Sequence, residues 1–179
     1  MKMISAMSFE GRKLFMSYSK RDPKTGEVRM LMRVVEPKDA AGMSMLIHEH
    51  KDREDDMWIY IPALRKVKRI AASGKAGSFM GTDFSNYDIG GGELEDWDYK
   101  LLGEEKVNGW DCWKIEAIPK SRKVIRKSGY SKVIKWVRKD NYVVVRSDHY
   151  DKSGSLFKRI IVPKVEKIRG VWFEVEMVA

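Results

Sequence analysis

The chain has 179 residues, with 35 Lys and Arg against 26 Asp and Glu, and its formal net charge is +9. This length fits one domain over residues 1–179, which can bury roughly 70% of the surface that the unfolded chain exposes. No apolar run approaches the about 18 residues of a membrane-spanning helix, which excludes an integral helical membrane protein. The single cysteine, Cys112, excludes an internal disulfide but does not fix the compartment.

The first residues of the chain, MKMISAM, lack the apolar core of an export signal. The sequence therefore leaves two alternatives open, a cytoplasmic protein or the mature part of an exported one.

Further along, the chain is predicted to be almost entirely β-structure. Strands are predicted at residues 28–36, 42–50, 57–61, 66–70, 97–107, 110–118, 131–138, 142–150, 155–165 and 171–178. Short turn sequences join most of them, and Asn108-Gly109 is the clearest. Such links favour an antiparallel meander in sequence order. Helices should be few: residues 37–41 could form one turn, and the basic residues 119–128 are either helical or disordered.

Methionines are concentrated in the first 80 residues. Met30 and Met32 are two residues apart, as are Met43 and Met45, so each pair shares one face of its predicted strand. If these strands are neighbours, four flexible thioethers line one patch, which suits irregular acyl chains. The alternative is that the methionines fill gaps in an ordinary core.

An aromatic strand and an ordered loop follow. The alternation in WIYI at 58–61 places Trp58 and Tyr60 on the same face. The segment SFMGTDFS at 78–85 sets Phe79, Met80 and Phe84 among small, turn-forming residues. This pattern favours a loop anchored by buried side chains over a mobile linker.

The runs WIYIPALRKVKRI at 58–70 and SFMGTDFSNYD at 78–88 resemble the bacterial outer-membrane lipoprotein-sorting protein family, relatives of the LolA and LolB lipoprotein carriers. The similarity extends over most of the chain, including RVVEPKDAAG at 33–42. It implies a mainly β fold, in which a curved antiparallel meander forms a half-open barrel around an apolar cavity. It also implies a periplasmic carrier without catalytic activity, which binds a lipid or lipoprotein acyl chain and has a membrane transporter as partner.

With this resemblance, we expect eight residues to line the cavity: Met30, Met32, Met43, Met45, Trp58, Tyr60, Phe79 and Phe84. Relatives of this kind carry an export signal, and we expect further strands beyond the last residues, EVEMVA at 174–179.

Basic runs at 66–69, 120–127 and 132–139 should attract a polyanion. Lys66, Lys68 and Arg69 are the expected contacts with a partner or with the headgroups of an anionic membrane. The stripe KVIKWVR at 132–138 mixes basic and aromatic residues, but no recognition helix, zinc spacing or RNA-binding motif accompanies it, so nucleic acid is not expected as a partner. Two alternatives stay open: a solvated basic face, and a non-carrier module with a filled interior whose basic face docks a transporter or nucleic acid.

Residues with catalytic chemistry are sparse. His48 and His50 share a strand face and would permit a metal site with His149 or Asp52, but histidines at the surface end of a strand are the simpler interpretation. We therefore predict no metal, cofactor or catalytic residue.

Two further features have structural interpretations. Asp83 and Asp88 could form a carboxylate pair, although Asp in such a loop more often bonds backbone amides. Cys112, between Trp110 and Trp113, is predicted to be a small buried residue.

Overall fold

The computed structural model describes residues 2–4, 11–51 and 53–179. These residues form a 12-stranded sheet with the order β6-β5-β4-β3-β2-β1-β12-β11-β10-β9-β8-β7. One half contains β1 (Lys2–Ile4), β2 (Arg12–Arg21), β3 (Val28–Glu36), β4 (Ser44–His48), β5 (Asp56–Ile61) and β6 (Lys66–Ile70). The other contains β7 (Trp97–Val107), β8 (Trp110–Pro119), β9 (Lys132–Arg138), β10 (Val144–Tyr150), β11 (Leu156–Ile168) and β12 (Val171–Val178).

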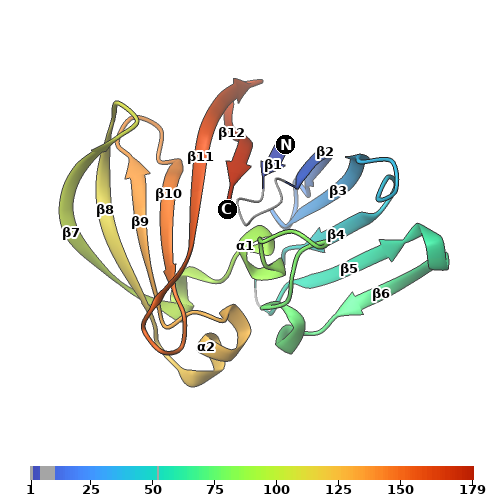
Figure 1. Cartoon of the computed structure of the whole chain (residues 1–179), viewed down its shortest axis with the longest axis horizontal. Helices are drawn as coiled ribbons and strands as arrows, with labels where there is room; N and C mark the ends of the chain where they lie inside the picture. The colour runs from blue at the N-terminus through green and yellow to red at the C-terminus, as the bar shows by residue number, and fades with distance from the viewer. Residues whose placement is uncertain (1, 5–10, 52) are drawn as a thin grey trace.

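Each half is an antiparallel meander, and the parallel pairing of β1 with β12 joins the two halves. The sheet bends at this junction and is not closed, with β6 and β7 as its edges (Figure 1). The predictions of a mainly β, largely antiparallel fold with few helices are therefore confirmed. The expectation of one uninterrupted meander in sequence order is wrong, because β1 pairs with the last strand.

The helices are short. They are α1 (Asn86–Gly90), α2 (Arg122–Ser128) and the 3-10 turns Pro62–Leu64, Ala72–Gly74 and Leu94–Asp96. The structure thus resolves the basic segment 119–128 in favour of a helix, and residues 38–41 form a turn as predicted. Among the described residues, no helix has the length and apolar character needed to cross a membrane.

The connection between β6 and β7, residues 71–96, runs between the two halves of the sheet and carries α1 (Figure 1). Phe79 and Phe84 are both 0% exposed, so the predicted anchoring of this loop by buried side chains is confirmed. Sequence patterns did not predict α1, which is only five residues long. A capping box starts it, because Ser85 accepts a bond from the Asp88 amide while the Asp88 carboxylate accepts one from the Ser85 amide.

Two apolar clusters lie between the sheet and this connection. In the first half, Phe79, Met80 and Phe84 pack against Met32, Met45 and other side chains of β2–β5. In the second half, Tyr87 and Trp97 pack against strands β8 and β9 and helix α2. The connection therefore covers the inner face of the first half, and α1 reaches across to the second.

Candidate ligand-binding cavity

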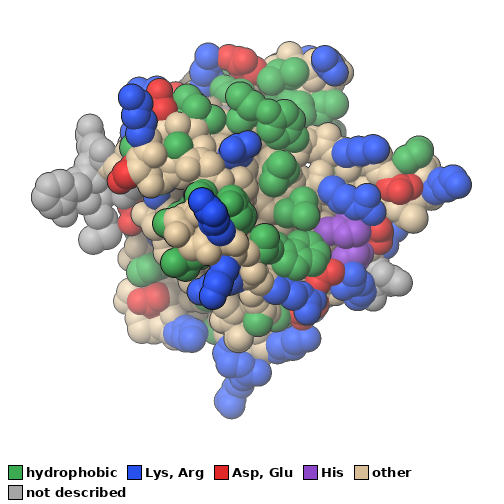
Figure 2. Space-filling model, turned by 90° about the vertical axis from the view of Figure 1, so that its right-hand side faces the viewer, with side chains coloured by type: hydrophobic (Ala, Val, Ile, Leu, Met, Phe, Trp, Pro, Cys, Tyr) green, Lys and Arg blue, Asp and Glu red, His purple; other side chains and the backbone are tan. Residues whose placement is uncertain are grey.

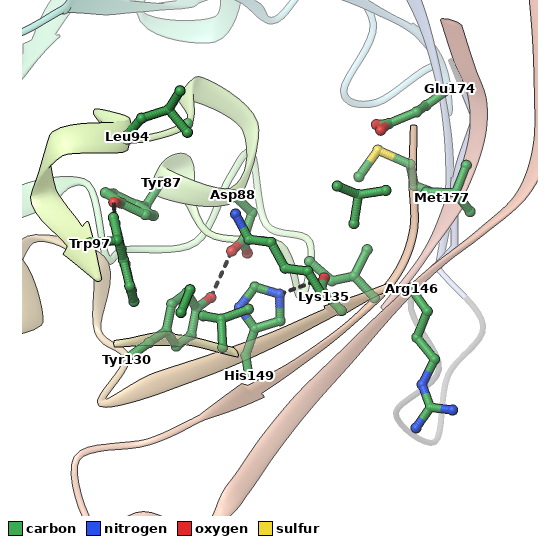
Figure 3. A pocket seen from close by; sticks show the side chains of 18 of the residues that line it. Tyr87, Asp88, Leu94, Trp97, Tyr130, Lys135, Arg146, His149, Glu174 and Met177 are labelled. Atoms are coloured by element: carbon green, nitrogen blue, oxygen red, sulfur yellow. Dashed lines mark hydrogen bonds between the residues drawn. The ribbon is translucent and has the colours of Figure 1, made fainter. Parts of the chain in front are cut away.

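A cavity of about 210 Å³ lies on the inner face of the second half of the sheet, beside α1 (Figure 3). Apolar side chains from three strands make up much of its lining, among them Ala117, Val133 and Ile160. Tyr87 of α1 and Trp97 of β7 line it as well, and the Trp97 indole N–H donates to the Tyr87 hydroxyl at 3.0 Å. Burial raises the pKa of Tyr87 to about 12, so the phenol stays neutral.

A buried network holds α1 against the sheet. The Tyr130 hydroxyl donates to Asp88 Oδ1 at 2.8 Å, and Lys158 Nζ donates to Asp88 Oδ2 at 2.5 Å. Burial opposes ionisation of Asp88, yet the Lys158 charge prevails and the pKa of Asp88 falls below its usual value. The predicted bond between Asp88 and a backbone amide is confirmed, since its Oδ2 accepts from the Ser85 amide at 2.7 Å. The buried Oδ2 of Asp83, in contrast, has no hydrogen-bond partner among the described residues.

His149 forms part of the cavity lining. Its Nε2 lies 2.8 Å from the Ser147 hydroxyl and its ring lies 4.5 Å from that of Tyr130, whereas its buried Nδ1 has no partner among the described residues. Burial lowers the pKa of His149 to about 4, so the ring is neutral near pH 7. The cavity therefore contains a neutral, partly unsatisfied imidazole beside apolar side chains.

Besides Asp88 and Arg146, two further charged residues line the same cavity, Lys135 of β9 and Glu174 of β12 (Figure 3). Neither side chain has a hydrogen bond or ion pair among the described residues. Burial lowers the pKa of Lys135 and raises the pKa of Glu174, because both charges are partly removed from water. An unpaired charge in such surroundings is costly, and a ligand of opposite charge would offset that cost.

None of the eight residues expected around a ligand lines this cavity. Met32 and Met45 are 1% and 0% exposed, and they pack in one cluster with Phe79 and Phe84. Met30 and Met43 are partly buried against the same cluster. In this structure, side chains of the 71–96 connection pack against these methionines.

Trp58 and Tyr60 lie on the other face of the sheet. Met45 pairs with Ile59, which packs into the core, whereas Leu46 pairs with Trp58 on the outer face. Tyr60 is 37% exposed. The two aromatic residues do share a face, as predicted, but it is not the face of Met32 and Met45.

The predicted basic contacts lie on the edge strand β6, and all three side chains are exposed. Lys66 and Lys68 pair with Ile61 and Ile59, whereas Arg69 pairs with Trp58 and donates to Asp56. The three residues therefore do not project from one face. Figure 2 shows the side of the molecule where β5 and β6 lie, with hydrophobic side chains near its centre and Lys and Arg spread around them.

The structure also separates the histidines. His48 and His50 lie together at the end of β4, with ring centroids 4.1 Å apart, whereas His149 lies in the cavity. A metal site that joins them to His149 is therefore excluded by the fold, and Asp52 lies outside the described residues. Cys112 is 1% exposed on β8, as predicted.

Sequence reasoning missed the cavity residues because they lie far apart in the chain. One local signal was present: Val133, Lys135 and Val137 share a strand face, so a lysine interrupts an apolar row. Only the fold shows that α1 leaves this face partly open.

Comparisons with known proteins agree with this architecture. A family model described as "Uncharacterized protein" matches residues 26–179. A DUF1329 family protein from Desulfovibrio piger is 37% identical, with a TM-score of 0.79 and coverage of 94% of this chain and 70% of that one. A putative outer membrane lipoprotein-sorting protein domain from Vibrio parahaemolyticus is 31% identical, with the same TM-score and coverage. No curated protein matches the chain significantly.

A LolA superfamily protein from Nitrosomonas europaea is similar in fold, with 21% identity, a TM-score of 0.60 and coverage of 92% of this chain and 67% of that one. The fold is thus that of a LolA-like protein. The chain belongs to the family of the Desulfovibrio piger DUF1329 protein and the Vibrio parahaemolyticus lipoprotein-sorting domain, which confirms the family resemblance seen in the sequence.

Proposed function

We propose that the protein is a periplasmic carrier, or an accessory protein of a lipid transporter, that binds the acyl part of a lipid or lipoprotein beside α1. The observation that carries this proposal is the apolar cavity on the inner face of β7–β12. The name of the Vibrio parahaemolyticus relative supports it, as does the LolA-like fold. The mechanism requires binding and release only, without a chemical step.

The size of the cavity limits what it can enclose. Its volume of about 210 Å³ is below the roughly 300–1,000 Å³ of pockets that bury a drug-sized ligand. We therefore expect it to hold a segment of an acyl chain, with the remainder along the exposed Tyr99 and Leu101 of β7. Each buried methylene contributes about 0.8 kcal/mol, against the cost of ordering the chain.

The unpaired Lys135 favours an amphiphile with an anionic group. A carboxylate or phosphate at the ammonium would neutralise its charge in surroundings where water competes weakly. Glu174 disfavours a second anionic group near β12. A lipid with one acidic head and one acyl chain in the cavity satisfies both conditions.

Contact with an anionic membrane is the second part of the proposal. Exposed Lys66 and Lys68 lie on one face of the edge strand β6, and exposed Tyr60 and Val67 lie on the opposite face of the same sheet edge. Basic and apolar side chains together suit a surface of anionic headgroups over hydrocarbon. Release would follow when the membrane or a partner offers equal burial of the acyl chain.

The alternative function is a module that docks a transporter and holds no ligand. The filled core around Met32 and Met45 supports this alternative, because it leaves no space for a ligand in the first half of the sheet. In that case the cavity beside α1 would also stay without lipid.

Native mass spectrometry of protein purified from cells tests the proposal, combined with lipid extraction. A carrier should retain a lipid, and we expect its head to be anionic. Protein that carries no lipid, and takes up none from mixed vesicles after delipidation, would contradict the proposal and favour the docking module.

A further inference from the structure

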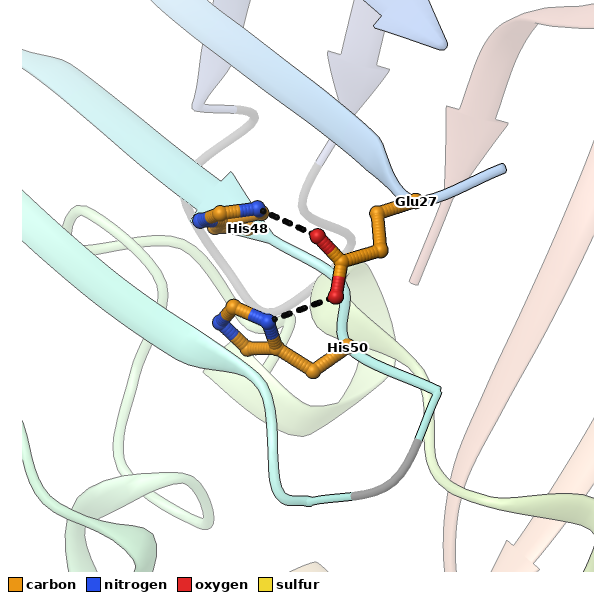
Figure 4. A group of neighbouring side chains, drawn as sticks. All are labelled: Glu27, His48 and His50. Carbon is orange, nitrogen blue, oxygen red and sulfur yellow. Dashed lines mark hydrogen bonds and ion pairs between the residues drawn. The ribbon is translucent and has the colours of Figure 1, made fainter. Parts of the chain in front are cut away.

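Three potential metal ligands meet at one end of the first half of the sheet (Figure 4). Glu27 immediately precedes β3, His48 ends β4, and His50 lies in the connection to β5. One ligand atom of each residue lies within 4.8 Å of those of the other two. The cluster is separate from the cavity beside α1, and the family resemblance did not predict it.

The distances within the cluster are compatible with a metal ion. Glu27 Oε1 lies 3.1 Å from His50 Nδ1, and Glu27 Oε2 lies 3.3 Å from His48 Nε2. With Zn²⁺ bonds of about 2.0–2.1 Å, neighbouring ligand atoms in a tetrahedral site are about 3.3 Å apart. Short side-chain rotations would therefore bring all three atoms to one ion.

A buried carboxylate can orient His50. Asp56 is 6% exposed, and its Oδ2 lies 3.1 Å from His50 Nε2. In metal sites, a histidine ligand usually donates its second ring N–H to such an acceptor, which directs the other nitrogen to the ion. With Nε2–H donated to Asp56, the Nδ1 lone pair of His50 is directed at Glu27.

The cluster also has an alternative explanation without a metal. Arg53 Nη2 lies 2.6 Å from His50 Nε2, and Arg29 Nε lies 3.4 Å from His48 Nε2. If His50 instead carries its proton on Nδ1, it donates to Glu27 and the group is a hydrogen-bond network. Arg29 and Arg53 are exposed, so both side chains have room to move away from a bound cation.

We propose that Glu27, His48 and His50 bind a divalent transition-metal ion, with Zn²⁺ as the ion that best suits two imidazoles and one carboxylate. The side chains of His48 and Glu27 are 19% and 20% exposed, so solvent reaches the site and water can take a fourth position. Because the ligands come from the ends of different strands, the ion would tie together the β2–β3 and β4–β5 connections.

Isothermal titration of the metal-free protein with Zn²⁺, and absorption spectra with Co²⁺, test this proposal. We expect one ion per chain, a rise in melting temperature with Zn²⁺, and the intense visible bands of four-coordinate Co²⁺. The variants Glu27→Gln and His48→Gln should each weaken Zn²⁺ binding at least about tenfold, since each removes a ligand. The matched control is Glu36→Gln, because this exposed glutamate at the other end of β3 is outside the cluster.

Melting temperatures without metal show whether each variant is folded. Folded Glu27→Gln with weakened binding, beside Glu36→Gln with parental binding, would support the site. No Zn²⁺ binding by the parent, or equal binding by the parent and His48→Gln, would overturn the proposal and leave a hydrogen-bond network. Neither result depends on lipid binding, so the two proposals succeed or fail separately.

Discussion

Met45 lies in the filled core of the first half of the sheet. Its side chain is 0% exposed and packs in the cluster with Phe79 and Phe84. We expect Met45→Glu to lower the free energy of unfolding by more than about 4 kcal/mol, because the carboxylate would be buried without a partner. Urea denaturation measures this change.

The control is Leu46→Glu, on the opposite strand face and 37% exposed, which should change stability by less than about 1 kcal/mol. If Met45→Glu were as stable as Leu46→Glu, water would have to reach Met45, and the face described as filled would be open.

The buried His149 should make the free energy of unfolding depend on pH. Its pKa is about 4 in the folded protein and 6.5 in the reference state, because burial penalises the charged ring. The unfolded chain therefore binds more protons between these values, and stability should fall as pH decreases from 6.5 to 4. The full shift corresponds to about 3 kcal/mol.

Urea denaturation at intervals across this range measures the effect, with His149→Gln as the comparison. The variant should lose the part of the pH dependence that protonation of His149 contributes. An unchanged slope in the variant would assign the effect to other groups.

At the scale of strands and helices, the sequence predicts regular elements well and pairings poorly. Strands 28–36, 97–107 and 171–178 have the predicted bounds, because alternation and turn residues are local signals. The strand β2 was missed since only Phe15 among its ten residues is buried, which leaves little alternation to detect. The β1–β12 pairing joins the two ends of the chain, and no local pattern encodes it.

Two exposed lysines of the edge strand β6 are the proposed contacts with an anionic membrane. Lys66→Glu together with Lys68→Glu should reduce binding to anionic vesicles, because both ammonium groups are exposed and would attract headgroups. Arg69 is left unchanged because it bonds Asp56. Parental binding should exceed binding to neutral vesicles and weaken as salt rises to about 0.5 M, and vesicle co-sedimentation measures both.

Lys100→Glu with Lys152→Glu is the control, since it makes the same change in net charge at exposed positions on β7 and in the β10–β11 turn. Equal losses in the two double variants would indicate a general charge effect rather than contact through β6.

At the scale of the whole molecule, the two halves of the sheet differ in what covers their inner faces. The 71–96 connection fills the first half with Phe79 and Phe84, and over the second half it leaves a cavity beside α1. Sequence alone predicted an apolar cavity lined by residues of the first half, whereas the cavity beside α1 is lined by residues of the second half and of α1. The pattern of methionines is the same for a filled core and for a ligand site, and only the path of the connection distinguishes them.

Filling the cavity tests its role most directly. Ala117 lines it and is 1% exposed, so the larger side chain of Ala117→Phe would extend into the space that we assign to an acyl chain. Its neighbour Ile118 lies on the opposite face and is 44% exposed, which makes Ile118→Phe the matched control. The measurement is binding of a fluorescent fatty acid to delipidated protein, with melting temperatures to confirm folding. We predict that Ala117→Phe stays folded and loses at least about tenfold in affinity, while Ile118→Phe binds like the parent. Parental affinity in a folded Ala117→Phe variant would contradict the assignment of the cavity as the lipid site.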